Sequence, residues 1–325
     1  MDRQRRLIIA AAAFGFPFGA ASLSWAAQPW PNRPIKLIVP RGAGSGADIA
    51  ARLLAEHLAP LWEQVVVVEN RPGGDSAVAI NTLLAAQDDH MLLYAPASSI
   101  TAHVFQHDKP AYDIAALIPV AKVSTTTIGF IVAPSLGVTS LAEFVEYVRA
   151  HPGKLNFSTG TGLTDLIVEG YFKSAGLSIT RIPYRDVTAP ITDLGEGRIH
   201  AYVAGLAAMI PSIESGRARF VAVTNTARAA SQPHTPTVAE AGFPALTFDG
   251  LVGIFAHHNM AAAVRDRIAA DVRKALAETR LAERFNKLGV VISPGDAAEF
   301  AAALKEQGAT LAGIAAATGM MPNSR

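Results

Sequence analysis

Three glycines lie between residues 42 and 46, directly after an apolar run and before a segment of helical character. The run Ile35–Val39 predicts a buried strand, and the apolar spacing over 48–62 predicts an amphipathic helix. A strand–loop–helix junction of this kind leaves backbone N–H groups unpaired at the start of the helix, where anions bind readily. The loop Arg41–Asp48 is therefore a candidate anion site.

A second junction, over residues 158–165, concentrates hydroxyl groups and glycines in the sequence Ser-Thr-Gly-Thr-Gly-Leu-Thr-Asp. It follows a short predicted strand over 155–157 and precedes a predicted helix over Asp165–Ser174. Helix capping alone needs one such residue, whereas this junction has four hydroxyls and two glycines. Two donor-rich junctions, one in each of two predicted units, indicate a ligand held between them.

The first loop also admits two other interpretations. Gly42–Ala47 matches the G-x-G-x-x-[G/A] pattern of dinucleotide-binding folds, and Glu69 closes the next predicted strand, where a ribose-binding acid would lie. Pro40 and Arg41 lengthen the loop, which disfavours a dinucleotide. A purely structural glycine turn is the second alternative. Small-anion binding is the interpretation we favour, and residue types alone leave all three open.

Ser98 and Ser99 follow the third predicted strand, so an exported α/β serine hydrolase is an alternative from another functional class. A nucleophile elbow needs G-x-S-x-G, whereas Ala43 and Ala47 flank Ser45, and no base is obviously placed for either of the other serines. The histidines are scattered apart from one adjacent pair, and the chain has no cysteine. We therefore expect no catalytic residue, no metal site and no cofactor.

Residues 1–26 have the pattern of a secretory signal peptide cleaved near Ala26, with three arginines, an apolar run and small residues before the cleavage point. The apolar run covers 15 residues and contains Gly15 and Pro17, whereas a membrane span needs about 20 residues. We expect an exported protein. Removal of residues 1–26 leaves 25 basic and 26 acidic residues. A nearly neutral chain without a basic run is not expected to bind nucleic acid.

Apolar strand-like runs alternate with helical segments over residues 35–94 and again after about residue 120. This alternation predicts two α/β units, each with a parallel sheet covered by helices. The last part of the chain, which includes alanine-rich segments over 261–277 and 297–304, is predicted to be mostly helical. A proline-containing loop over 233–244 offers a place for the chain to return to the first unit.

Several blocks of the chain resemble the periplasmic solute receptors of tripartite tricarboxylate transporters, the Bug family. The most specific are Glu-Asn-Arg-Pro-Gly at 69–73 and Pro-Thr-Val-Ala-Glu-Ala-Gly at 236–242, and other matches run in family order from about residue 30 to 305. The resemblance implies a two-lobed α/β fold of the type II, Venus-flytrap class, with a helix-flanked sheet in each lobe. It assigns residues 27–126 and 247–325 to lobe 1 and residues 127–246 to lobe 2.

The resemblance also implies a function. It predicts a periplasmic receptor, not an enzyme, that captures a small carboxylate or related organic anion and delivers it to integral-membrane permease subunits. Family members commonly hold a ligand carboxylate on the two loops that match Arg41–Asp48 and Ser158–Thr164. A ligand-sensing receptor for a membrane kinase is the alternative, because the same fold serves both roles. We expect a monomer.

Three departures from the family pattern bear on the ligand. Arg41 replaces a usual aromatic residue and is placed to contact a carboxylate with its guanidinium. Asp165 replaces a frequent histidine, and Ala204 replaces a frequent aspartate, whose loss disfavours a ligand amino group. The residues expected to contact the ligand are Arg41, Gly42, Ala43, Gly44, Ser45, Asp48, Ser98, Ser99, Ser158, Thr159, Thr161, Gly162, Thr164, Asp165 and Ala204.

Overall fold

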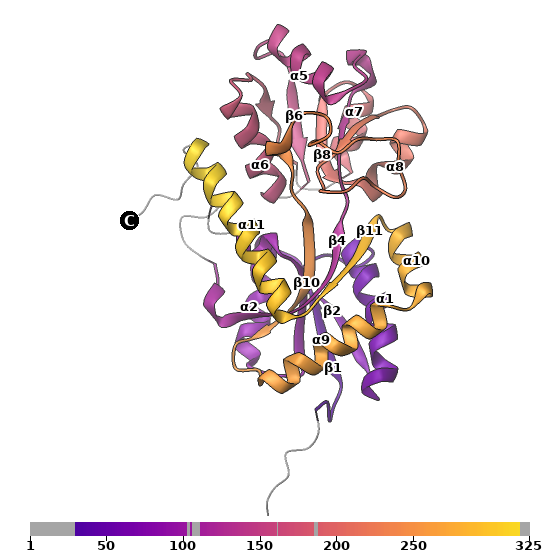
Figure 1. Ribbon diagram of the computed structural model, residues 1–325, viewed down its shortest axis with the longest axis vertical. Helices are drawn as coiled ribbons and strands as arrows, with labels where there is room; N and C mark the ends of the chain where they lie inside the picture. The colour runs from indigo at the N-terminus through magenta and orange to yellow at the C-terminus, as the bar shows by residue number, and fades with distance from the viewer. Residues whose placement is uncertain (1–29, 103–104, 106–110, 161, 185–187, 319–325) are drawn as a thin grey trace, which may run out of the picture.

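The computed structural model describes residues 30–102, 105, 111–160, 162–184 and 188–318. The predicted signal peptide and Thr161 lie outside the described residues. Within the described ranges, no helix combines the length and apolar character that a membrane crossing requires. The described chain forms two sheets with their helices, which we call lobe 1 and lobe 2, and Figure 1 shows them stacked along the long axis of the molecule.

Lobe 1 contains a six-stranded sheet in the order β11-β4-β10-β3-β1-β2. Strand β1 runs parallel to β2 and β3, whereas β10 is antiparallel to both β3 and β4, and β11 is antiparallel to β4. The strands are β1 (Ile35–Val39), β2 (Val66–Asn70), β3 (Met91–Pro96), β4 (Leu117–Thr126), β10 (Gly250–His257) and β11 (Val290–Gly295). The helices are α1 (Gly46–Trp62), α2 (Ala77–Ala86), α3 (Ser98–Thr101), α9 (Ala262–Leu276), α10 (Thr279–Lys287) and α11 (Ala297–Thr318).

Lobe 2 contains a five-stranded sheet in the order β7-β6-β8-β5-β9. Strand β6 runs parallel to β7 and β8, and β5 is antiparallel to β8 and β9. The strands are β5 (Ile128–Val132), β6 (Asn156–Thr159), β7 (Thr180–Arg181), β8 (Ala201–Gly205) and β9 (Arg219–Val223). The helices are α5 (Leu141–Ala150), α6 (Gly162–Ser174), α7 (Ala189–Gly195) and α8 (Leu206–Glu214).

The apolar run at β1 is buried because helices cover both faces of the lobe 1 sheet. Leu37 and Val39 pack into one core cluster with α1 and α9, while Ile38 points to the other face and packs with α2. Side chains alternate between the two faces of a strand, so a strand covered on both sides is apolar at successive positions. The core of the sheet thereby holds the end of β1, and the loop after it, in a fixed place.

The sheets are mixed, which corrects the prediction of parallel sheets. The C-terminal part is also less helical than predicted, because β10 and β11 both join the lobe 1 sheet. Strand β10 lacks a continuous apolar run since it contains Gly250 and Gly253, and glycine is unfavourable in strands. Gly253 is required there, because a Cβ atom would collide with the ring of Phe300 on α11.

Two chain segments cross side by side between the lobes. The first is Thr127, between β4 and β5, and the second leads through Asp249 into β10. The buried Asn225 joins them: its Nδ2 donates to the carbonyl of Thr126 (3.1 Å) and to Asp249 Oδ1 (2.9 Å), and its Oδ1 accepts from Ile128 N (2.8 Å). The crossing segments are therefore tied into one unit.

Helix α11 makes a third connection between the lobes, visible along one side of the molecule in Figure 1. Phe300, in its first half, packs in a hydrophobic core cluster of lobe 1, and Leu311, in its second half, packs in the hydrophobic core of lobe 2. Between them, Gln307 accepts from Thr101 Oγ1 (2.7 Å) and donates to the carbonyl of Asp249 (3.0 Å). The end of this helix thus packs on lobe 2, although the family resemblance assigns the whole of 247–325 to lobe 1.

Candidate functional site

The loop after β1 presents backbone amides to open space. Ser45 begins α1 as its N-cap and accepts from Asp48 N (3.3 Å), and Gly44 adopts a left-handed φ of 80°. A Cβ atom added at any of the three loop glycines would meet no atom within 4 Å. The first-turn amides of Gly46 and Ala47 have no hydrogen-bond partner among the described residues. These donors are available to an anion.

Asp48 organises this loop from within. Its carboxylate is buried and accepts from Gly44 N (2.9 Å), Arg52 Nε (3.0 Å) and Asn70 Nδ2 (2.8 Å). Burial alone would raise the pKa of Asp48, but the hydrogen bonds from Arg52, Gly44 and Asn70 outweigh it, so the pKa lies below its ordinary value. Asp48 is predicted to contact the ligand. Both of its carboxylate oxygens already accept hydrogen bonds from the protein, so its role is to hold the loop in position.

Arg41 carries a cation with no partner in the described part of the chain. Its side chain is half-buried, and its guanidinium makes no hydrogen bond or ion pair with a described residue. Burial lowers the pKa of Arg41, and the negative charge of Asp75 opposes that shift. Guanidinium remains charged in proteins, and taking a charge out of water is costly unless an opposite charge accompanies it. The position of Arg41 therefore favours an anionic ligand.

The end of β3 supplies Ser98 and Ser99. Ser99 is buried, its Oγ lies 2.9 Å from Ser76 Oγ, and its carbonyl accepts from the hydroxyl of Tyr112. Over the described ranges, neither serine has a hydrogen bond to a histidine. The arrangement gives no support to a serine nucleophile, since such a nucleophile needs a base within hydrogen-bond reach.

The lobe 2 junction is built around Asp165. Arg181 donates to it from Nε (2.8 Å) and from Nη2 (2.8 Å), and Thr159 donates from Oγ1. Burial raises the pKa of Asp165 above its ordinary value, Arg181 opposes the rise, and the charges of Glu169 and Asp75 add to it. Asp165 and Arg181 thus form an ion pair at the start of α6.

Several predicted contact residues shape the lobe 2 junction from beneath it. Ser158, Thr164 and Ala204 are buried. The methyl of Ala204 packs against Gly160, where an added Cβ atom would lie 2.6 Å from it, and Gly160 N donates to the carbonyl of Val203 (2.9 Å). Gly162 begins α6. Ala204 therefore fits against the loop that turns into α6.

The two junctions influence each other electrostatically across the lobes. The charge of Asp75, on the turn between β2 and α2, acts on Arg41 in lobe 1 and on Asp165 in lobe 2. The loop after β1 and the start of α6 therefore both lie within electrostatic range of this turn. Asp75, in the sequence Arg-Pro-Gly-Gly-Asp-Ser at 71–76, is not among the contact residues that the sequence predicts.

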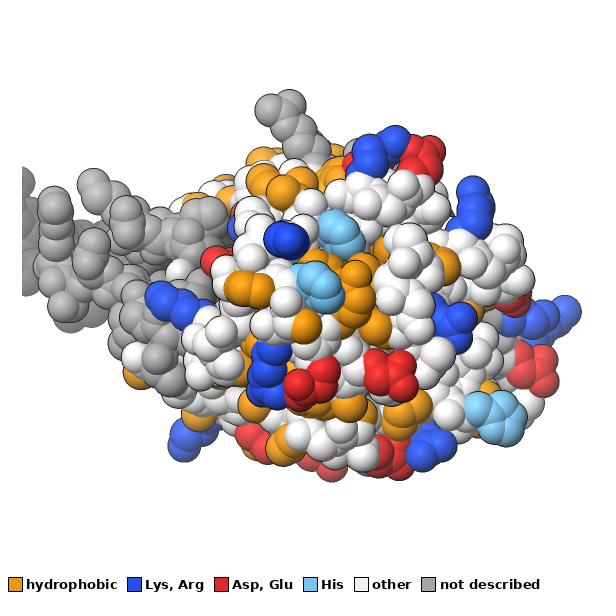
Figure 2. Space-filling model, turned by 90° about the horizontal axis from the view of Figure 1, so that it is seen from above, with side chains coloured by type: hydrophobic (Ala, Val, Ile, Leu, Met, Phe, Trp, Pro, Cys, Tyr) orange, Lys and Arg blue, Asp and Glu red, His pale blue; other side chains and the backbone are white. Residues whose placement is uncertain are grey.

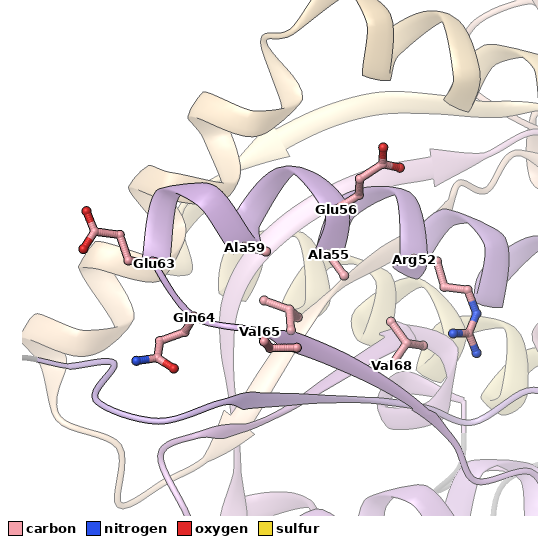
Figure 3. Close-up of a pocket in the computed structure, with 9 residues that line it drawn as sticks. Arg52, Ala55, Glu56, Ala59, Glu63, Gln64, Val65 and Val68 are labelled. Atoms are coloured by element: carbon pink, nitrogen blue, oxygen red, sulfur yellow. The ribbon is translucent and has the colours of Figure 1, made fainter.

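Two cavities lie elsewhere. One of about 620 Å³ is a groove between α1 and the edge strand β2, and Figure 3 shows its lining side chains, among them Ala55 and Val68. None of its lining residues belongs to the loop 41–48 or to the junction over 158–165, so it is distinct from both. The other, of about 340 Å³, lies beside Thr127 and is lined from both lobes, with Ser231 from lobe 2 and Lys287 from lobe 1.

The face of lobe 2 that looks away from lobe 1 carries basic and acidic side chains interspersed with apolar ones (Figure 2). No extended patch of one sign is visible on this face. Nucleic-acid binding relies on concentrated positive charge, and this face does not provide it.

Two α/β lobes joined by crossing segments are the architecture of a two-lobed solute-binding protein. The model for the "Tripartite tricarboxylate transporter family receptor" matches residues 50–320. The chain belongs to this family of periplasmic binding proteins.

Known relatives resemble the chain over most of its length. A UPF0065 protein of Bordetella bronchiseptica is 31% identical over 285 residues, which cover 86% of this chain and 84% of that protein. The protein BugT of Bordetella pertussis is 30% identical over 67% of this chain and 68% of its own length. Among solved structures, R. palustris Rpa4515 with adipate is 26% identical, covers 89% of this chain and 98% of its own, and superposes with a TM-score of 0.79.

Proposed function

We propose that this protein is a periplasmic receptor that binds a small carboxylate between its two lobes and delivers it to a tripartite tricarboxylate-type membrane permease. The observation that carries the proposal is the guanidinium of Arg41, which makes no hydrogen bond or ion pair with a described residue and belongs to the loop that leads from β1 to the open amides at the start of α1. The family match supports the receptor role. The adipate in the R. palustris relative supports a carboxylate as the ligand class.

In the proposed complex, the ligand carboxylate lies on the loop after β1. Arg41 contacts it through two guanidinium N–H groups, and the amides of Gly46 and Ala47 donate from the end of the helix. Ser45 and the exposed backbone of residues 42–44 line the same place. Thr159, at the end of β6, and Gly162, which begins α6, approach from lobe 2. Contacts from both lobes are needed, because a ligand favours closure only through contacts that closure adds.

The remaining steps concern export and assembly. The signal-like segment 1–26 would direct the chain to the periplasm and be removed near Ala26. The receptor would work as a monomer, so that a single chain binds the ligand and contacts the permease. Intact-mass measurement of the protein recovered from the periplasm tests the first point, since a mature chain starting at Ala27 is expected and a full-length mass would contradict it.

Thermal unfolding of the purified protein tests the ligand class. We expect adipate or a related carboxylate to raise the melting temperature. At a hundredfold excess over the dissociation constant, stabilisation should be about 2.7 kcal/mol. Sulfate and chloride at equal ionic strength control for non-specific ion effects. The absence of stabilisation across linear, branched and hydroxylated carboxylates would contradict the proposal.

A further inference from the structure

The cavity of about 340 Å³ lies where the chain crosses between the lobes, and we call it the hinge pocket. Thr127 of the first crossing segment and Ser231 of lobe 2 line it together with Asn286, Lys287, Val290 and Val291 of lobe 1. Pockets that hold small molecules begin at about 300 Å³. The hinge pocket is therefore large enough for a small organic ligand, and its walls come from both lobes.

Backbone hydrogen bonds fix Thr127 between the lobes. Its N–H donates to the carbonyl of Gly289 in lobe 1 (3.2 Å), and its carbonyl accepts from Leu206 N in lobe 2 (2.9 Å). The carbonyl of the preceding residue, Thr126, accepts from the buried Asn225. Thr127 is thus part of the connection between the lobes, and the wall that it contributes to the hinge pocket is held in place.

The side chain of Thr127 has a hydrogen-bonding capacity that the described chain does not use. The residue is only 5% exposed, yet its hydroxyl makes no hydrogen bond with a described residue. Such groups are uncommon in folded proteins, because a buried hydroxyl without a partner loses its bonds to water. Since Thr127 lines the hinge pocket, a molecule bound there can supply the missing partner.

The other side chains of the hinge pocket indicate the chemistry of that molecule. Lys287, exposed at the end of α10, is the only ionisable residue among the described residues that line the pocket, and it forms no ion pair with a described residue. The side chains of Ser231 and Asn286 also make no hydrogen bond within the described chain. Val290 and Val291 add an apolar wall, and Val291 is 43% exposed. One cation beside an apolar wall favours an anion with a single charge and a short apolar body.

We propose that the hinge pocket is a second ligand site, which takes a small monocarboxylate with a short apolar chain and is coupled to the carboxylate site between the lobes. Lys287 contacts the carboxylate, the valines pack against the chain, and the hydroxyl of Thr127 donates to the ligand. An occupant that touches both lobes favours one arrangement of them, and so changes the affinity of the other site. This inference goes beyond the proposed function, because no residue of the loop 41–48 or of the junction over 158–165 lines the hinge pocket.

Titration with pentanoate, followed by amide NMR of the mature protein, tests the location and the ligand class. Acetate lacks most of the apolar chain and pentanamide lacks the charge, so both serve as controls. We expect pentanoate to shift the amide signals of Ser231 and Val291 and to bind there more tightly than either control. Arg41→Ala should leave these shifts unchanged. Shifts confined to Gly46 and Ala47, or equal affinities for pentanoate and pentanamide at the hinge pocket, would overturn the proposal.

Two variants test the residues that hold the ligand. Lys287→Gln removes the charge and should weaken pentanoate binding at the hinge pocket by about fivefold or more. Thr127→Val removes the hydroxyl and should also weaken it by about fivefold, without lowering the melting temperature, because the hydroxyl has no protein partner to lose. Lys274→Gln, at an exposed position of α9, is the matched control and should bind like the wild type. Wild-type affinity in both pocket variants would overturn the site.

The coupling is measured through the affinity for adipate. A concentration of pentanoate that fills only the wild-type hinge pocket should change the apparent affinity for adipate differently in the wild type and in Lys287→Gln. Competition at the carboxylate site is common to both proteins, so the difference isolates the hinge pocket. An identical change in both would overturn the coupling. Failure of every carboxylate to bind between the lobes, with the pentanoate shifts at Ser231 retained, would contradict the proposed function alone.

Discussion

Gly160→Ala should disturb the lobe 2 junction through a single defined collision. The added methyl would lie 2.6 Å from Ala204 Cβ and 3.3 Å from Ala204 Cα. Comfortable contacts between carbon atoms are about 3.5–4.0 Å. Because Gly160 does not have a positive φ, the substitution adds no backbone strain, and the collision is the dominant effect.

The expected magnitude follows from that overlap. Overpacking a rigid core costs about 1–3 kcal/mol, and the reduced freedom of alanine in the unfolded chain returns about 0.4–1 kcal/mol. We expect Gly160→Ala to lower the free energy of unfolding by about 1–2 kcal/mol. The loop leading into α6 should also shift, so that carboxylate affinity falls.

The partner substitution makes the test specific. Ala204→Gly removes the methyl that Gly160→Ala would strike, and alone it should cost about 1 kcal/mol, because glycine weakens a strand. The double variant should be more stable than the sum of the single effects by about 1 kcal/mol or more, measured by urea unfolding as a double-mutant cycle. Additive effects, or a Gly160→Ala variant as stable as the wild type, would refute the reasoning.

Two further predictions concern residues that hold the site in place. The lowered pKa of Asp48 adds stability that is present above its unfolded pKa of about 3.9 and is lost as pH falls through the folded pKa. Asp48→Asn should therefore lower stability at neutral pH and reduce the loss on acidification below about pH 4, as followed by urea unfolding across pH. Asn225→Ala removes hydrogen bonds that tie the crossing segments and should cost about 2–3 kcal/mol, since each bond contributes about 1 kcal/mol. A loss below 0.5 kcal/mol would show that the crossing segments do not depend on this side chain.

Elements with strong periodicity could be predicted almost to the residue. The sequence predicts a strand over Ile128–Val132 and a helix over Leu141–Ala150, and β5 and α5 have these bounds. Their sequences satisfy every local signal at once: β5 is continuously apolar, and Ser140 caps α5 by accepting from Glu143 N. Strands β10 and β11 were missed because pairing in the sheet, rather than an apolar run, determines them.

In the candidate site, too, features set by neighbouring residues could be predicted, whereas features set by contacts between distant segments could not. The loop after β1 could be predicted, because strand, glycines and helix are adjacent in sequence. The role of Asp48 depends on Asn70, which reaches it from the end of the neighbouring parallel strand. The left-handed backbone of Asp75 and the Ser76–Ser99 contact next to it could not be predicted from the sequence. Contacts between distant segments of the chain thus decide how these loops are held.

The most direct test of carboxylate binding is the affinity of Arg41→Ala, measured by isothermal titration calorimetry with the carboxylate that most stabilises the wild type. Loss of a bidentate, charge-assisted contact should weaken binding by about tenfold to a hundredfold. Arg41→Lys should recover only part of the loss, because lysine keeps the charge without the planar fork. The control Arg149→Ala, at an exposed position of α5, should bind like the wild type. An Arg41→Ala variant with wild-type affinity would contradict a carboxylate held by Arg41.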